Sequence, residues 1–117
     1  MIKLERIDKP WGYEEVWAKT DTYVGKILSI TKENRLSLQY HEKKEETIRV
    51  LSGKMILHFG YKKEKLKTVL LVENDTFHIR PGLIHRFEAR EEDVIIIEVS
   101  TPELDDVVRL EDDYDRV

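Results

Sequence analysis

Short strand-like segments separated by turn residues run through most of this sequence, and they constrain its fold more than any other feature. The segments are residues 23–30, 35–41, 47–51, 55–61, 66–72, 76–79, 85–89 and 94–99. Asn34, Gly53, Asn74–Asp75 and Pro81–Gly82 stand between them as turn formers. Short strands at roughly regular spacing are typical of a β-sandwich or a closed barrel. The sequence therefore predicts an all-β fold.

One segment near the end of the chain departs from this pattern. In residues 103–110, Leu104, Val107, Val108 and Leu110 follow one another at spacings that suit one face of a helix. We expect a short helical turn there, which folds back across the barrel.

The length of 117 residues fits one domain spanning residues 1–117. The absence of cysteine excludes a disulfide scaffold, a zinc-thiolate site and a thiol nucleophile. The first ten residues are too polar for a signal peptide, and no apolar run approaches the roughly 18 residues of a membrane span. These features predict a soluble, cytoplasmic protein that does not enter the membrane.

The charge of the chain argues against a nucleic-acid partner. The net charge is −4, and the lysines and arginines are scattered apart from a short stretch at 62–67, which reads as an exposed hairpin tip. Charged residues make up 38% of the chain, while there are two Met, two Asn and a single Gln. This composition is typical of a protein from a thermophile. It also makes the lone glutamine, Gln39, conspicuous.

Residues 35–41 alternate strictly between polar and apolar side chains. Arg35, Ser37, Gln39 and His41 share one face of this predicted strand. In a sandwich such a face would meet water, whereas in a barrel it can line a cavity that holds a ligand.

Four residues form a candidate metal site. Gln39 and His41 lie two apart on one strand, Glu46 follows after a turn, and His85 opens a strand after Pro81–Gly82. Two imidazoles, one carboxylate and one amide oxygen suit one divalent first-row metal ion such as Zn, Mn, Co, Fe or Ni, with coordination positions left open.

The spacing of these residues resembles the two motifs of the cupin superfamily. Gln39-x-His41-x4-Glu46-x6-Gly53 resembles the first motif, with Gln in place of its first His, and residues 81–85 resemble the second. The six-residue gap to Gly53 favours Glu46 over its neighbour Glu45 as the carboxylate ligand. The resemblance implies a cupin-type double-stranded β-helix, or jelly-roll, barrel.

The chain is similar, more narrowly, to the type II phosphomannose isomerase family in its free-standing small form. The matching segments are 9–14, 36–41, 85–88, 97–99 and 105–112. The family usually has extra histidines after the first and a His-Trp pair after the glutamate, where this chain has residues 42–44 and Thr47–Ile48. These departures leave the four ligands intact and the substrate open.

The resemblance implies a metal-dependent aldose–ketose isomerase acting on a phosphorylated hexose, mannose 6-phosphate and fructose 6-phosphate in the family. Glu98 is a candidate catalytic carboxylate, or else the buried partner of a cation. Arg109 is a candidate catalytic and phosphate-binding residue, or else pairs with a nearby acid, and Arg35 is a second candidate for the phosphate, or else an exposed rim residue. We also expect a homodimer.

Two rival functions remain open at this point. One is a non-enzymatic or differently acting metal-binding cupin that serves as a sugar-binding or sensory module, because a fold alone does not fix a function. The other is oxygen chemistry at the metal, against which the glutamine ligand argues.

Overall fold

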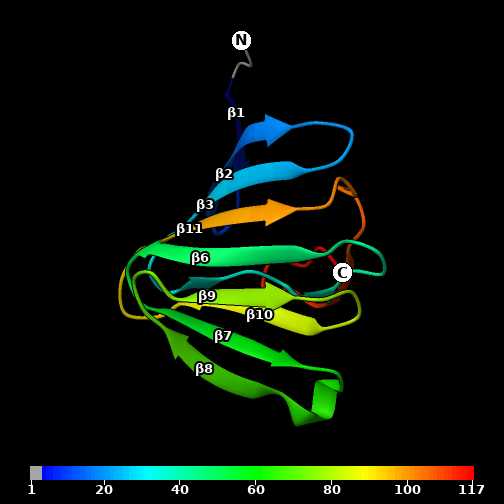
Figure 1. Cartoon of the computed structure of the whole chain (residues 1–117). Helices are drawn as coiled ribbons and strands as arrows, with labels where there is room; N and C mark the ends of the chain where they lie inside the picture. The colour runs from blue at the N-terminus through cyan, green and yellow to red at the C-terminus, as the bar shows by residue number, and fades with distance from the viewer. Residues whose placement is uncertain (1–3) are drawn as a thin grey trace.

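The computed structural model describes residues 4–117 and consists of two antiparallel β-sheets (Figure 1). The first sheet has the order β1 (Glu5–Lys9), β2 (Gly12–Lys19), β3 (Val24–Ile30), β11 (Val94–Ser100), β6 (Glu46–Ser52) and β9 (Thr76–Ile79). The second has the order β12 (Val108–Glu111), β5 (Leu38–Tyr40), β10 (Ile84–Ala89), β7 (Met55–Gly60) and β8 (Lys67–Leu71), with β4 (Asn34–Arg35) also paired to β10. The all-β prediction is confirmed.

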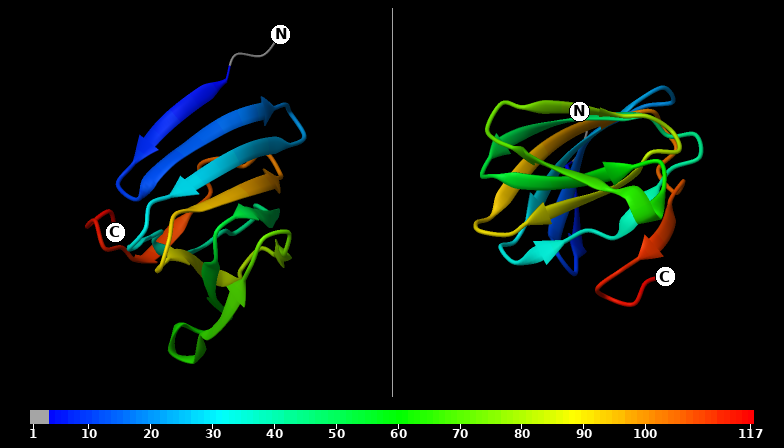
Figure 2. Two further views of the ribbon diagram at one scale, coloured as in Figure 1. Left: turned by 90° about the vertical axis from the view of Figure 1, so that its left-hand side faces the viewer. Right: turned by 90° about the horizontal axis from the view of Figure 1, so that it is seen from below.

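The core lies between the two sheets, as the further views in Figure 2 show. Because successive side chains of a strand point to opposite faces, every second residue of β6, β7 and β11 faces inward. Ile48, Val50, Met55, Leu57 and Ile96 are fully buried there. At one end of the barrel, polar residues replace these apolar ones on the same inward faces, which leaves room for a site.

The predicted helical turn at residues 103–110 is wrong. Leu104 and Asp105 form a turn, and β12 then pairs with β5, with Val108 opposite Tyr40 and Arg109 opposite Gln39. The free edge of β5 offers backbone groups that need partners, and the β-branched pair Val107–Val108 suits a strand. The short 3-10 turn η1 (Lys63–Lys65) is the helical element in the described part of the chain, and no helix there could span a membrane.

The predicted strand 35–41 is also divided in two. β4 and β5 both pair with β10, but Arg35 lies opposite Glu88 and Gln39 lies opposite His85. Four residues on one side therefore match three on the other, as in a β-bulge, so the face on which side chains point changes between Arg35 and Gln39. Strands β1 and β2 were not predicted, because half of their residues are charged.

Gly53 and Gly82 provide a matched test of the turns that hold the barrel together. Their φ values are nearly equal, +85° and +84°, but an added Cβ would lie 2.3 Å from the Asp93 carbonyl oxygen at Gly53 and would meet nothing within 4 Å at Gly82. Gly82→Ala should cost about 1–2 kcal/mol for the backbone conformation alone. Gly53→Ala should cost about 1–3 kcal/mol more, because the β6–β7 turn must shift. Urea unfolding of the metal-free proteins measures both, and equal losses would contradict the steric argument.

Candidate metal centre and its cavity

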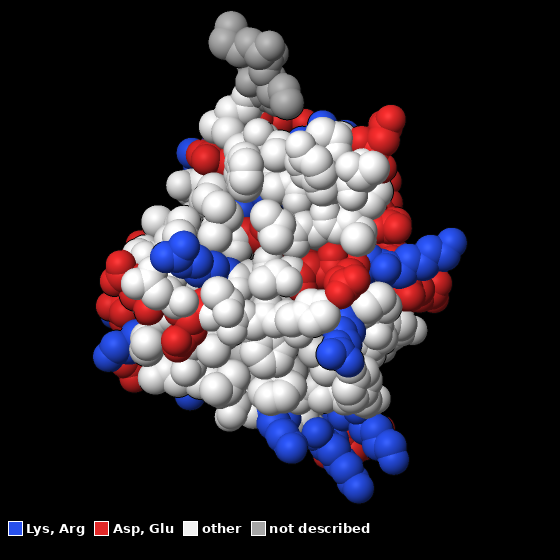
Figure 3. All heavy atoms as spheres, in the orientation of Figure 1, with Lys and Arg blue, Asp and Glu red and all other residues white. Residues whose placement is uncertain are grey.

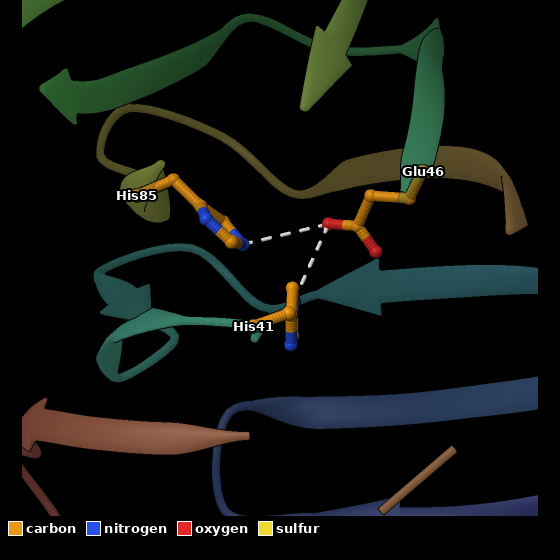
Figure 4. A group of neighbouring side chains, drawn as sticks. All are labelled: His41, Glu46 and His85. Atoms are coloured by element: carbon orange, nitrogen blue, oxygen red, sulfur yellow. Dashed lines mark ion pairs between the residues drawn. The ribbon is translucent and has the colours of Figure 1, made fainter. Parts of the chain in front are cut away.

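Three buried side chains from three segments meet at the polar end of the barrel (Figure 4). His41 follows β5, Glu46 begins β6 and His85 lies in β10. Glu46 Oε1 lies 3.4 Å from His85 Nε2 and 3.9 Å from His41 Nε2, and their candidate ligand atoms all lie within 4.8 Å of one another. A metal with ligand bonds of roughly 2.0–2.2 Å would draw such atoms together by only a small movement.

The backbone fixes the orientation of both imidazole rings. His41 Nδ1 lies 2.5 Å from the Asp106 carbonyl oxygen, and His85 Nδ1 lies 2.9 Å from that of Leu83. Because a carbonyl oxygen only accepts, each Nδ1 carries a hydrogen and donates it. Burial lowers the pKa of His41, which favours its neutral form. Its Nε2 lone pair then faces the Glu46 carboxylate with no hydrogen between them, an arrangement that fits a bound cation.

Asp106 holds the loop that carries His41. Its carboxylate accepts hydrogen bonds from the backbone N–H groups of Glu42, Lys43 and Lys44 at 3.1, 2.7 and 2.8 Å. These three bonds hold the pKa of Asp106 below its usual range. The residue thus orients His41 through its own carbonyl and shapes the following loop through its side chain.

Gln39 lies beside the group. Its backbone pairs with that of His85 across β5 and β10, and its side chain lines the same cavity. The amide Nε2 donates to Ser37 Oγ at 3.0 Å, which leaves the amide oxygen as an acceptor. The structure therefore brings Gln39, His41, Glu46 and His85 together around one space.

A buried lysine links Glu46 to Glu98. Lys44 Nζ lies 3.0 Å from Glu46 Oε2 and 3.2 Å from Glu98 Oε2. Burial would raise the pKa of Glu46, but the hydrogen bond with His85 and the charge of Lys44 outweigh it and hold that pKa well below its usual range. Burial and then the charge of Glu46 raise the pKa of Glu98 to about 8. The two carboxyl groups therefore differ in protonation near neutral pH, with Glu46 charged.

The cavity has a volume of about 130 Å³, and its lining carries more positive than negative groups. Five cationic side chains line it against three carboxylates, namely Lys9, Lys26, Lys44, Arg109 and Arg116 against Glu14, Glu46 and Glu98. Lys26 Nζ and Lys9 Nζ share one oxygen of Glu14, at 3.4 and 4.0 Å. A bound divalent cation would add to this excess. The cavity is therefore suited to an anionic ligand.

The two arginines considered for phosphate binding lie in different places. Arg109 on β12 lines the cavity, and its buried Nε has no hydrogen-bond partner within the protein. Arg35 lies outside the cavity lining and forms a bidentate pair with Asp113 at 2.7 and 2.9 Å. The change of face between β4 and β5 explains why Arg35 does not share the orientation of Gln39.

Other predicted alternatives are separated by exposure. Glu45 is exposed and pairs with His78, so Glu46 is the glutamate that enters the cavity. His58 pairs with Glu88 away from the site. Arg86, expected to be structural, donates from Nε to the Leu36 carbonyl.

Sequence reasoning missed three charged residues of the cavity: Glu14, Lys26 and Lys44. Each lies at a position where an apolar residue follows two places later with the same inward orientation, namely Val16, Leu28 and Glu46 followed by Ile48. A charged residue in phase with core positions was the available clue.

Solved structures with the same fold include other cupin barrels. Capsular polysaccharide assembling protein CapF from Staphylococcus aureus matches 95% of this chain at a TM-score of 0.82 and 19% identity, with 35% of CapF covered. KdgF from Halomonas sp. matches 86% of this chain at 0.71 and 17%, with 90% of KdgF covered. Oxalate decarboxylase from Lactobacillus farciminis matches 92% at 0.76 and 18%, with 33% of that protein covered.

These identities show a shared fold, and this chain spans about a third of the length of CapF. No match was found among curated proteins. At the level of sequence, the family described as "Mannose-6-phosphate isomerase C-terminal" matches residues 2–112, which is nearly the whole chain. The chain therefore belongs to the mannose-6-phosphate isomerase C-terminal family and folds as a cupin-type double-stranded β-helix barrel.

Proposed function

We propose that this protein is a metal-dependent aldose–ketose isomerase of a phosphorylated hexose, with mannose 6-phosphate and fructose 6-phosphate as the first pair to test. The observation that carries the proposal is one cavity that combines the His41–Glu46–His85 group with an excess of cationic side chains. The first feature suits a divalent metal, and the second suits an anionic sugar. Family membership supplies the reaction class.

Aldose–ketose isomerisation moves a proton between C2 and C1 of the sugar through an enediol, so it requires a group that takes the proton from one carbon and returns it to the other. Glu98 is our candidate for this group, because it is buried, lines the cavity and is held by Lys44. A divalent metal held by His41, Glu46, His85 and Gln39 would supply Lewis-acid polarisation of the sugar oxygens.

Arg109 is our candidate for the phosphate group. Its guanidinium lies in the cavity, and its buried Nε still lacks a hydrogen-bond partner. A guanidinium can bind two phosphate oxygens at once, which positions the ligand as well as attracting it. Arg116, by contrast, is paired with Asp112 at 2.7 Å, and Arg35 is paired outside the cavity.

The deciding experiment is an assay of the metal-loaded protein with a panel of hexose phosphates, in which aldose–ketose interconversion is followed directly. Interconversion of at least one pair supports the proposal. Saturable binding of a phosphosugar without interconversion would assign the barrel to a sugar-binding module. Metal binding without affinity for any phosphosugar would leave it a metal-binding cupin of another function.

The metal site itself is tested without substrate. The wild-type chain should retain one divalent ion after saturation and desalting, as measured by elemental analysis. His85→Ala should weaken metal affinity by at least about a hundred-fold, since even residues that only support a ligand contribute up to that much. His58→Ala is the matched control, because His58 lies outside the cavity, and its metal content should be unchanged. Equal retention in both variants would contradict the site.

Gln39→Leu separates ligation from packing. The substitution keeps a side chain of similar size but removes the amide oxygen that faces the cavity. We expect metal affinity to fall by about tenfold or more, while the free energy of unfolding of the metal-free protein changes by less than about 1.5 kcal/mol. Isothermal titration with the metal and urea unfolding give the two values. Unchanged affinity would make Gln39 a bystander.

Arg109→Ala tests phosphate recognition, with Arg35→Ala as its matched control. Loss of a charged hydrogen bond of about 1.5–3 kcal/mol should lower kcat/KM for the phosphosugar by about 10- to 100-fold. Turnover of the unphosphorylated sugar and metal content should hardly change. Arg35→Ala should affect neither substrate. Equal losses on both substrates in the Arg109 variant would assign that residue to structure.

A further inference from the structure

The outer face of the first sheet, which points away from the core, carries an exposed apolar surface. Ile27 on β3 and Ile95, Ile97 and Val99 on β11 point outward, because their neighbours in sequence point inward. Val99 is 50% exposed. Figure 3 shows this side of the molecule, where the surface over β3 and β11 is largely uncharged and charged side chains lie around it. We call this surface the outer face.

Trp17 extends the outer face across β3. It lies at a bulge of β2, and its indole covers Gly25, where an added Cβ would lie 2.6 Å from the ring. Gly25 pairs with Val99 on the next strand, so the indole lies beside the exposed valine. Trp17 remains 41% exposed. A large ring placed flat on a sheet and left in water is favourable chiefly when something else covers it.

Opposite charges stand on the two borders of the outer face. The backbone register places Glu15, Ile27, Ile97 and Arg49 in one row across β2, β3, β11 and β6. The acidic border therefore lies on β2 and the basic border on β6, with two isoleucines between them. Arg49 is held in place by one hydrogen bond, from Nη2 to Asn74 Oδ1.

This row fits a second copy of itself in one orientation. A two-fold axis that lies in the interface, parallel to the strands and between β3 and β11, exchanges the two borders. Ile27 then faces Ile97 of the second copy, and Glu15 faces Arg49 of the second copy, twice by symmetry. An axis across the strands would instead oppose like charges. Sheets pack face to face at about 10 Å with their strands about 30° apart, a distance that Glu and Arg side chains can span together.

We propose that the outer face is the isologous interface of a homodimer, built from Trp17, Ile27, Ile97 and Val99 and bordered by the Glu15–Arg49 pairs. Self-complementarity is what a two-fold interface requires. The inward residues of the same strands, among them Glu14, Lys26 and Glu98, line the cavity on the opposite side of the sheet. The dimer therefore leaves the cavity free, and the proposal does not depend on the enzymatic function.

Sedimentation velocity of the metal-free and metal-loaded wild-type chain, over about a hundred-fold range of concentration, gives the first test. We expect a species of twice the 13.9 kDa chain mass that dissociates on dilution. A chain that stays monomeric at the highest concentration would overturn the proposal.

Charge exchange identifies the face and the orientation. Glu15→Arg and Arg49→Glu should each raise the dimer Kd by at least about tenfold, because each places like charges opposite one another twice. The double variant should return to within about threefold of wild type, since the opposite charges meet again. Glu64→Arg, on the exposed η1 turn, is the matched control and should leave Kd unchanged. A double variant no better than the two singles would overturn the proposed arrangement, even if the chain dimerises.

Discussion

The ammonium group of Lys44 allows two carboxylates to lie together inside the barrel. Glu46 and Glu98 come from neighbouring strands, are almost completely buried and would repel each other without a cation between them. Lys44 lies within 3.2 Å of an oxygen of each. Removing one member of such a buried group leaves an uncompensated charge, which costs far more than the pair contributes. The position of Glu46, and with it the geometry of the two histidines, depends on this contact.

Alternation along each strand gives the first sheet two unrelated surfaces. On β3 and β11, the inward positions supply Lys26 and Glu98 to the cavity, while the outward positions supply the isoleucines of the outer face. A change of register by one residue would exchange these roles completely. The bulges in the sheets are therefore informative, because each marks a point where a side chain is turned from one surface to the other.

Sequence reasoning went furthest where one strand carried its own evidence. The regular spacing of turn residues predicted the all-β fold, and the motif spacing pointed to Gln39, His41, Glu46 and His85, which the structure brings around one cavity. It failed at Arg35, because the bulge between β4 and β5 depends on the partner strand β10 and leaves no mark on the sequence. It failed at residues 103–110 for a similar reason, since the free edge of β5 selects a strand over a helix. Lys44 was missed because a lysine in a charged loop gives no indication that folding will bury it.

Asp106 also determines when the site can form. It joins the loop after β5 from more than sixty residues further along the chain, and it provides both the partner of His41 and three loop hydrogen bonds. On a ribosome, a nascent chain that has released only β1 to β11 would contain all four candidate ligands but lack the residue that orients one of them. Such a chain could form much of its core while its histidines remained free to capture a metal in the wrong geometry. The preorganised site thus arises only after the last strands of the barrel have emerged, which links correct metal uptake to the end of synthesis.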